Sequence, residues 1–396
     1  MPVETLSPEH VQLRELVREF ARNEVRPHWR ELEDAGEFPR ELYRQMGELG
    51  FFGCCIPEEL GGNGMGYTAH TIVSEGLAWA HPPLSAAMNL QAATVPLTIA
   101  NWGRPELAER YVPALVGGEL LGYNGMTEPD GGTDLLGAMR THAVRDGDDY
   151  VLNGAKMFIT NANVADVGII YAKTDAEKAH RGVSAFIVET STSGFEARRV
   201  PCGALGTLMP TTSITLDDCR VPAGNLLGAE GEGFKVAMNA MDFGRLTVAA
   251  RSLGLAQACL DASLEYANSR MAFGEKIGSF QMIKHHLADM VCEVAAARHL
   301  VYRAATLYDE GILATRESSI AKYYAGEVGV RAAQAAAEIF GGYAFTDEYQ
   351  ISVFLAYSKL NQTGEGSANL QRILLADDAL GWKSMDRHRS TVKVRA

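Results

Sequence analysis

Residues 362–372 form the segment best suited to chemistry, because Glu365 lies there between Gly364 and Gly366, directly before an apolar helical pattern. A carboxylate is a candidate for acid–base chemistry, and glycine neighbours let the backbone approach a ligand closely. A glutamate at the start of a helix is also favoured by the helix dipole alone. The segment by itself therefore leaves a catalytic and a purely structural interpretation open.

Four further segments place glycine and polar residues where packing alone would not favour them. Residues 123–134 gather glycine, threonine and acidic residues in one loop, whose NH groups and hydroxyls suit a polar ring edge or a phosphate, although a turn-rich loop is the plainer interpretation. Residues 156–161 indicate a strand with Phe158 and Thr160 on one face. Arg270 suits a pyrophosphate or a helix dipole, and residues 339–343 end a helix in two glycines, as in a C-cap.

The hydrophobic pattern predicts helices at both ends of the chain. From Ser7 to about Leu120 the pattern is helical and begins with Ser7 as an N-cap and Pro8 at the first helical position. After about Phe234 long helices return, each with one apolar stripe, which predicts a helical bundle. We expect an N-terminal helical domain at 1–121 and a C-terminal bundle domain at 234–396.

Between these helices the pattern changes to short β-type runs. Two runs, 150–152 and 156–160, are expected to flank a tight hairpin turn at Asn153-Gly154. Three more follow, at 167–171, 184–189 and 213–216. Closely spaced strands of this kind are typical of a small β-barrel or sandwich, so we expect a middle β domain at 122–233 and an α+β fold overall.

The composition excludes several classes of partner. Acidic residues outnumber basic ones by 49 to 36 in a chain of 396, and the net charge of −13 disfavours binding to nucleic acid or to an anionic membrane. Residues 1–10 lack the features of a signal peptide, and no stretch has the apolar length needed to span a bilayer, so we expect a cytoplasmic protein. The six cysteines lack zinc-site spacing, so we expect reduced, buried thiols and no metal.

Taken in order, the five segments resemble the motifs of the acyl-CoA dehydrogenase family over essentially the whole chain. The motifs are Thr-Glu-Pro-x-x-Gly-Thr-Asp, Asn-Gly-x-Lys-x-Phe-Ile-Thr-Asn, Arg-Met-Ala-Phe-Gly, Ile-Phe-Gly-Gly-Tyr and Glu-Gly-Ser-x-x-Leu-Gln-Arg. Each motif is weak alone, but the ordered set is very specific. Residues 242–245 and 270–274 are most similar to the short-chain branch.

The resemblance implies a three-domain homotetramer with one FAD per subunit between the β domain and the bundle. It implies that the flavin ring is lined by Tyr123, Met126, Thr127, Phe158 and Thr160, and that Gly132 and Thr133 border the flavin and the thioester. Arg270, Phe273 and Gln281 match positions that reach a neighbouring subunit's FAD, and Glu338, Gly341 and Gly342 match the stretch near the FAD phosphates. Ser367 and Asn369 are further cofactor candidates, and the substrate candidates are Thr133, Asp242, Phe243, Arg245, Gly364 and Gly366.

The same resemblance places the catalytic base at Glu365, which would remove the α-proton of an acyl thioester while a hydride leaves the β-carbon. Burial should raise the pKa of this glutamate and make it a better base. The oxygen of the thioester would accept hydrogen bonds from a flavin ribityl hydroxyl and from the NH group of Glu365. Some relatives carry the base at the position of Gly244, which here has no side chain.

The resemblance leaves the substrate and the direction of reaction open. An acyl-CoA dehydrogenase that reduces an electron-transferring flavoprotein is the leading expectation. The alternatives are a dehydrogenase for acyl or aminoacyl groups on a carrier protein, an enoyl-thioester reductase, and a flavin-binding subunit with little catalysis of its own. Nitroalkane oxidases share the fold, but they use an aspartate as base.

Four features depart from the family pattern. Gly364 replaces a bulky residue, commonly tyrosine, which enlarges the pocket beside the reacting carbons. Either this space admits a branched, cyclic or polar acyl group, or another side chain fills it. Ala356 and Tyr357 replace an Arg-Asp ion pair, and Thr207 and Met209 stand where many relatives carry arginine and serine. Glu338 replaces a common glutamine near the FAD phosphates, where an ionised acid would be repelled unless it were protonated or paired.

Overall fold

The computed structural model describes residues 6–203 and 206–385, which divide into two compact units. The first, here called the helical unit, contains described residues from 6–34, 67–86 and 245–385. The second, here called the mixed unit, contains 35–66, 87–203 and 206–244. The predicted domain boundaries, 1–121, 122–233 and 234–396, remain predictions. The first five residues of the N-terminal segment lie outside the described part.

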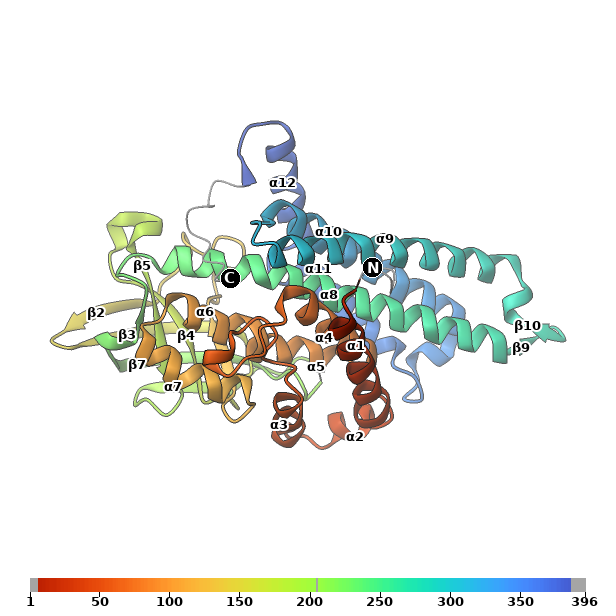
Figure 1. Cartoon of the computed structure of the whole chain (residues 1–396), viewed down its shortest axis with the longest axis horizontal. Coiled ribbons are helices and arrows are strands. Elements are labelled where there is room, and N and C mark those ends of the chain that lie inside the picture. Colours follow the sequence, from red (N-terminus) through yellow and green to blue (C-terminus); the bar gives the residue numbers. More distant parts are fainter. Residues whose placement is uncertain (1–5, 204–205, 386–396) are drawn as a thin grey trace. The chain divides into compact units, whose positions relative to one another are not determined.

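Long helices make up most of the helical unit, and α8, α9 and α10 run side by side (Figure 1). The unit contains α1 (Pro8–Phe20), the π-helix η2 (Ala21–Val25), α2 (Trp29–Asp34), α4 (Gly66–Ala80), part of α5 (Pro82–Asn89), most of α8 (Gly233–Ser269), α9 (Gln281–Asp309), α10 (Thr315–Phe340), α11 (Ile351–Thr363) and α12 (Ala368–Ala379). A short hairpin of β9 (Met271–Ala272) and β10 (Glu275–Lys276) joins α8 to α9.

Small residues allow the bundle helices to approach closely. On α10, Ala325, Gly329 and Ala333 recur at four-residue spacing and are buried. A Cβ atom on Gly329 would lie 3.5 Å from the backbone oxygen of Ser252, so α10 and α8 pack almost backbone to backbone there. The predicted N-terminal cap is also present, because the Oγ of Ser7 accepts a hydrogen bond of 3.2 Å from the NH of His10. The bundle predicted from the apolar stripes is confirmed.

The mixed unit combines short helices with an eight-stranded sheet. Its helices are α3 (Arg40–Glu48), η3 (Glu58–Leu60), the π-helix η4 (Leu90–Thr94), α6 (Val95–Trp102), α7 (Pro105–Val116), η5 (Ala176–Gly182) and η6 (Ala223–Asn225). The strands follow the order β6-β7-β3-β2-β4-β5-β8, with β1 paired to β4, and they are β1 (Gly122–Gly125), β2 (His142–Asp146), β3 (Asp149–Thr160), β4 (Val167–Lys173), β5 (Val183–Glu189), β6 (Phe195–Arg199), β7 (Thr211–Pro222) and β8 (Leu226–Leu227).

The predicted hairpin turn at Asn153-Gly154 is wrong. Residues 149–160 form one continuous strand, β3, and the pairing of β3 with β7 shifts register between Leu152 and Gly154. Gly154 has a φ of 147°, and a Cβ atom there would lie 2.5 Å from the Oγ1 of Thr141, so the position requires glycine. The Asn-Gly pair therefore supplies the backbone freedom for a β-bulge and not for a turn.

Six free cysteines lie in the described residues, and Cys292 among them is exposed, which corrects the expectation that all thiols are buried. Burial raises the pKa of the Cys54 thiol to about 12.

No helix in the described part of the chain is both long enough and apolar enough to cross a membrane.

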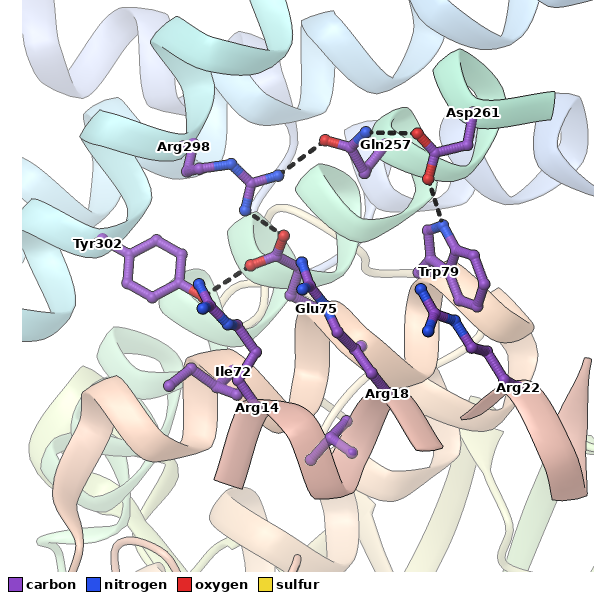
Figure 2. Close-up of a pocket in the computed structure, with 12 residues that line it drawn as sticks. Arg14, Arg18, Arg22, Ile72, Glu75, Trp79, Gln257, Asp261, Arg298 and Tyr302 are labelled. Carbon is purple, nitrogen blue, oxygen red and sulfur yellow. Dashed lines mark hydrogen bonds and ion pairs between the residues drawn. The ribbon is translucent and has the colours of Figure 1, made fainter. Parts of the chain in front are cut away.

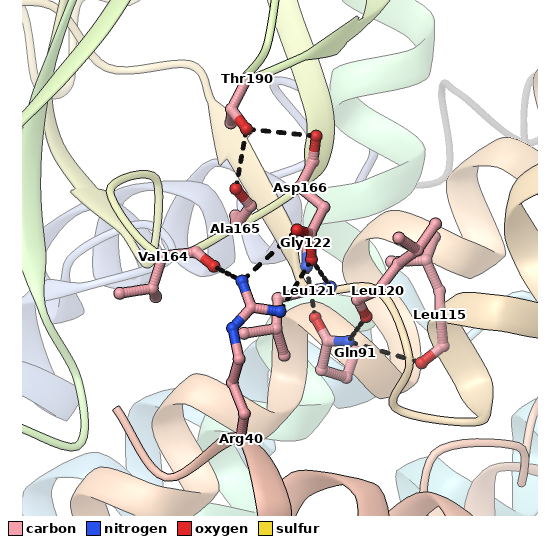
Figure 3. Close-up of polar contacts among 10 residues, drawn as sticks. All are labelled: Arg40, Gln91, Leu115, Leu120, Leu121, Gly122, Val164, Ala165, Asp166 and Thr190. Atoms are coloured by element: carbon pink, nitrogen blue, oxygen red, sulfur yellow. Dashed lines mark hydrogen bonds and ion pairs between the residues drawn. The ribbon is translucent and has the colours of Figure 1, made fainter. Parts of the chain in front are cut away.

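The buried side chain of Gln91 and the partly exposed side chain of Asp166 fix the start of β1, from which the first candidate loop leaves (Figure 3). The Oε1 of Gln91 accepts a hydrogen bond of 2.5 Å from the NH of Gly122, and its Nε2 donates to the backbone oxygen of Leu120. The carboxylate of Asp166 accepts from the NH of Leu121 and pairs with Arg40. Strand β1 is thus held at its first residues by groups from η4, α3 and the turn before β4.

Replacement of Gln91 by leucine should destabilise the mixed unit. The change leaves the NH of Gly122 and the oxygen of Leu120 without these partners in a buried place, and each unsatisfied group costs about 1–3 kcal/mol. We expect the free energy of unfolding in urea to fall by roughly 2–4 kcal/mol. Gln12→Leu, on the exposed face of α1, is the control and should change it by less than about 0.5 kcal/mol. Equal effects of the two changes would contradict the role of Gln91.

Candidate active site

A buried ion pair connects two of the motif segments in the mixed unit. The Nζ of Lys156 on β3 lies 2.8 Å from the Oε1 of Glu128, and the two side chains are 0% and 4% exposed. Lys156 also donates to the backbone oxygen of Tyr171, and Glu128 also accepts from the NH groups of Arg140 and Thr141. Burial lowers the pKa of Lys156 to about 8, and the lysine helps to hold the pKa of Glu128 below its usual range.

This pair brings the predicted flavin-ring residues of the two segments close together. The NH of Met157 donates to the backbone oxygen of Thr127 at 2.9 Å, and the Nζ of Lys156 reaches the oxygen of Met126. Directly after Lys156 the pairing of β3 with β7 shifts register again, and Phe158 has a φ of 58°. Its side chain is 63% exposed, which is unusual for a strand phenylalanine and leaves the ring free to contact a ligand.

The other candidates of the mixed unit lie in different surroundings. Thr160, at the end of β3, is partly exposed, and Gly132 and Thr133 lie exposed in the loop after Glu128. Tyr123 is fully buried, and its hydroxyl donates to the backbone oxygen of Val188 at 3.0 Å, so its side chain is part of the core of the unit. Asp242 and Phe243 are buried on α8. Their ligand contacts remain predictions.

In the helical unit, Glu365 lies in the short loop between α11 and α12. Glu365 has a φ of 51°, in the left-handed region of backbone conformation that few residues other than glycine adopt. Lys322, buried on α10, holds this loop, because its Nζ donates to the backbone oxygens of Gln362 at 3.1 Å and Gly366 at 2.6 Å. The next helix begins with Ser367 as its N-cap. One lysine therefore binds the chain on both sides of Glu365.

Three cations of the helical unit influence the carboxyl group of Glu365. Desolvation raises the pKa of Glu365, and Arg251, Lys322 and Arg245 act in the opposite direction. Burial lowers the pKa of Lys322 to about 8 and that of Arg251 to about 10, while the charge of Glu365 raises both. The net effect is a carboxyl group with a raised pKa beside cations that favour its ionised form.

The loop is braced differently from the family pattern described above. Ala356 and Tyr357 cannot form the usual Arg-Asp pair, and Tyr357 is fully buried. Instead, the Nε of Arg251 donates to the Oδ1 of Asn361 at 2.7 Å, and the Nε2 of Gln362 donates to Glu327 at 2.7 Å. A Cβ atom on Gly364 would meet only the backbone oxygen of Leu360 within 4 Å, at 3.3 Å, so the space beside this residue is open.

Four predicted cofactor residues of the helical unit share one hollow of about 520 Å³: Arg270, Glu338, Gly341 and Gly342. Gly341 has a φ of 58° and ψ of −132°, which favours glycine at this helix end. The carboxylate of Glu338 lies 3.0 Å from the Nε2 of His286. Glu338 therefore has a histidine partner, which would offset the charge of the carboxylate only when the imidazole is protonated.

The remaining candidates of the helical unit lie at its surface. Phe273, in the β9-β10 hairpin, is 97% exposed, and Gln281 is exposed at the start of α9. Asn369 is exposed and accepts a hydrogen bond from Arg372, while Ser367 is occupied as the cap of α12. None of these four lines the hollow at Arg270.

Comparison with known proteins gives the class of the chain, an oxidoreductase that acts on CH–CH groups, and its family. The chain matches the acyl-CoA dehydrogenase N-terminal domain over residues 7–119, the middle domain over 124–219 and the C-terminal domain over 231–380. The chain belongs to the acyl-CoA dehydrogenase family, which is FAD-dependent, and has its three-domain α+β fold.

Similar proteins include glutaryl-CoA dehydrogenase of Desulfococcus multivorans, which is 40% identical over 393 residues, 96% of this chain and 99% of the relative. A solved structure of a glutaryl-coenzyme A dehydrogenase with glutaryl-CoA has a TM-score of 0.93 at 39% identity and covers 97% of this chain and 98% of its own. The prolyl acyl carrier protein oxidase AnaB is also similar, with a TM-score of 0.89 at 27% identity over 95% of this chain and 100% of its own.

The sequence interpretation missed the residues that position the site. Lys156 and Glu128 were part of the quoted motifs, but nothing in their spacing showed that they pair. Lys322, Arg251 and Asn361 lie outside every motif. The one available signal for Lys322 was its place on the apolar face of a predicted helix. A lysine there is rarely buried without partners, so it indicates a buried polar contact.

Replacement of Lys156 by methionine should leave Glu128 as a buried charge and lower the free energy of unfolding by about 3–5 kcal/mol. The double variant Lys156→Met, Glu128→Gln should be more stable than the single variant, because it removes the uncompensated charge. Urea unfolding of both variants measures the difference. Arg198→Met, which breaks an exposed pair with Glu196, is the control and should cost at most about 1 kcal/mol. A double variant no more stable than the single one would show that the charge on Glu128 is not the cause.

Proposed function

We propose that this chain catalyses FAD-dependent α,β-dehydrogenation of an acyl-CoA thioester, with Glu365 as the base that removes the α-proton. The observation that carries the proposal is the state of Glu365, which a single buried lysine holds in a left-handed conformation and whose pKa is raised by desolvation. A glutamate that only stabilises the start of a helix through the helix dipole would need neither the left-handed conformation nor the raised pKa.

The surroundings of Glu365 suit proton abstraction from a weak carbon acid. A raised pKa makes the carboxylate a stronger base, while Arg251, Lys322 and Arg245 favour its ionised form. After the transfer the proton lies on the carboxyl group of Glu365. Gly364 and Gly366 leave the backbone on both sides without side chains, so the NH of Glu365 is available to a thioester oxygen.

The residues in place fit FAD. When bound, FAD accepts the hydride that leaves the β-carbon. The exposed ring of Phe158 on β3, with Thr160 at the end of the same strand and with Met126 and Thr127 in the neighbouring loop, suits a flavin ring. The guanidinium of Arg270 and the glycine backbone at Gly341 and Gly342, which line the hollow, suit phosphates. Tyr123, Gly132, Thr133, Ser367 and Asn369 complete the proposed set.

Gly364 supports a short, branched or cyclic acyl group as substrate. The family usually carries a bulky residue at this position, and here the space that its side chain would take is open apart from the oxygen of Leu360. A substrate wider than a straight chain fills such a space. Asp242, Phe243 and Arg245 on α8 are the proposed contacts of the rest of the thioester.

A second candidate differs only in the carrier of the acyl group. Similarity to a prolyl acyl carrier protein oxidase favours a thioester on a carrier protein as the alternative. The same acyl group offered on CoA and on a carrier protein, with flavin bleaching followed without oxygen, separates the two. Re-oxidation of the reduced protein by an enoyl thioester would instead indicate a reductase.

We also propose a homotetramer and an electron-transferring flavoprotein as electron acceptor, as the family pattern implies. Phe273 supports the first point, because a phenylalanine that is 97% exposed at the tip of a hairpin is suited to contact another subunit. Arg270 and Gln281 lie at the two ends of the segment that carries this hairpin.

Replacement of Glu365 by glutamine should abolish proton abstraction and leave FAD bound. We expect flavin bleaching by the best thioester of a panel of straight, branched, cyclic and dicarboxylic acyl groups to slow by about 10²–10⁴-fold. Stopped-flow absorbance without oxygen measures the rate, and Glu310→Gln, at an exposed glutamate of the same unit, is the control. Bleaching by Glu365→Gln at the rate of the unchanged protein would refute the proposed base.

The bleaching rate should also fall as the pH falls through the raised pKa of Glu365, because the protonated carboxyl group cannot act as a base. Arg251→Met removes a charge that lowers this pKa, so the acid inflection of the pH profile should move to higher pH. Arg251→Lys keeps the charge and should leave the inflection nearer its original place. An inflection that moves to lower pH in Arg251→Met would contradict the electrostatic assignment.

A further inference from the structure

A second cavity of the helical unit, about 390 Å³ in volume, lies among α1, η2, α4, α8 and α9 (Figure 2). It shares no residue with the loop of Glu365 or with the hollow at Arg270. Its volume is within the range of pockets that bind small molecules. The family motifs quoted above contribute nothing to its lining.

Three arginines from one stretch of chain line one side of this cavity. Arg14, Arg18 and Arg22 recur at four-residue spacing along α1 and η2, so they share a helix face. Figure 2 shows their side chains extending from that face toward Glu75 and Trp79. A fourth, Arg298, approaches from α9.

Both carboxylates of the lining are already used by other groups. Glu75 pairs with Arg298 and accepts a hydrogen bond of 2.7 Å from the hydroxyl of Tyr302. Asp261 accepts hydrogen bonds of 2.8 Å from the Nε1 of Trp79 and from the Nε2 of Gln257. Four arginines therefore face two carboxylates whose oxygens already have partners.

The guanidinium groups of Arg14, Arg18 and Arg22 make no hydrogen bond or ion pair with any residue in the described part of the chain. The Nε of Arg14 is buried and has no hydrogen-bond partner there. Arg18 and Arg22 are exposed, and both also line a separate surface hollow together with Glu15 and Glu19. A buried guanidinium nitrogen without a partner is unfavourable, and a bound anion would satisfy it.

We propose that this cavity binds a small anion with two or more negative charges, a phosphate or a polycarboxylate. Guanidinium groups bind both through paired N–H···O hydrogen bonds. Trp79 adds an apolar wall to the cavity. The excess of positive charge in its lining is notable in a chain with a net charge of −13. The proposal does not depend on the proposed dehydrogenase activity.

Isothermal titration of the purified protein with pyrophosphate and, separately, with citrate tests the proposal. We expect at least one of the two to bind saturably at one site per chain. The triple variant Arg14→Gln, Arg18→Gln, Arg22→Gln should weaken that binding at least tenfold, since each lost guanidinium removes charge-assisted hydrogen bonds. Comparison of the two affinities shows whether the cavity prefers phosphate groups or carboxylate groups.

The matched control removes the same charge elsewhere. Arg44→Gln, Arg198→Gln, Arg220→Gln changes three exposed arginines of the mixed unit and should leave the affinity within twofold. If the cavity triple variant does not fold by circular dichroism, the single variant Arg18→Gln, at an exposed position, takes its place and should still weaken binding. Absence of binding to the unchanged protein, or equal binding by the cavity variant and the control, would overturn the proposal.

Discussion

The ion pair between Lys156 and Glu128 is the interaction on which the candidate site of the mixed unit depends. Two charges with almost no exposure are stable only if each has its partners, so their geometry tolerates little movement. The pair fixes the loop after β1 to β3, and β3 in turn carries the bulge that exposes Phe158. Lys156 and Glu128, which are not expected to contact a ligand, therefore position the residues that are proposed to contact the flavin.

A second buried lysine, Lys322, holds the loop of Glu365 in the helical unit. Lys322 contacts only backbone oxygens around Glu365, and Arg251 contacts Asn361, so the loop depends on groups from α8 and α10 that lie far away in the sequence. Ala356 and Tyr357 cannot form an ion pair with each other, and the loop is held by these contacts.

Much of this molecule follows from its sequence. Apolar spacing predicted the helices, Ser7 predicted the first cap, and the order of five motifs predicted the family and singled out Glu365. Asn153-Gly154 misled, because its backbone freedom serves a bulge as readily as a turn, and β2 and β6 were missed because their residues are mostly charged or exposed. Buried pairing of Lys156 with Glu128 could not be predicted, since spacing along the chain does not show which charges meet.

Lys322 and Glu365 together set two limits on the pH range in which the loop has both an ionised glutamate and a charged lysine. Below one limit Glu365 keeps its proton, and above the other, near the pKa of about 8, Lys322 loses the charge that strengthens its bonds to the backbone. Closer burial raises the pKa of an acid and lowers that of an amine. An uncharged ligand group that covers this loop therefore narrows, from both sides, the pH range in which Glu365 is ionised and Lys322 is charged.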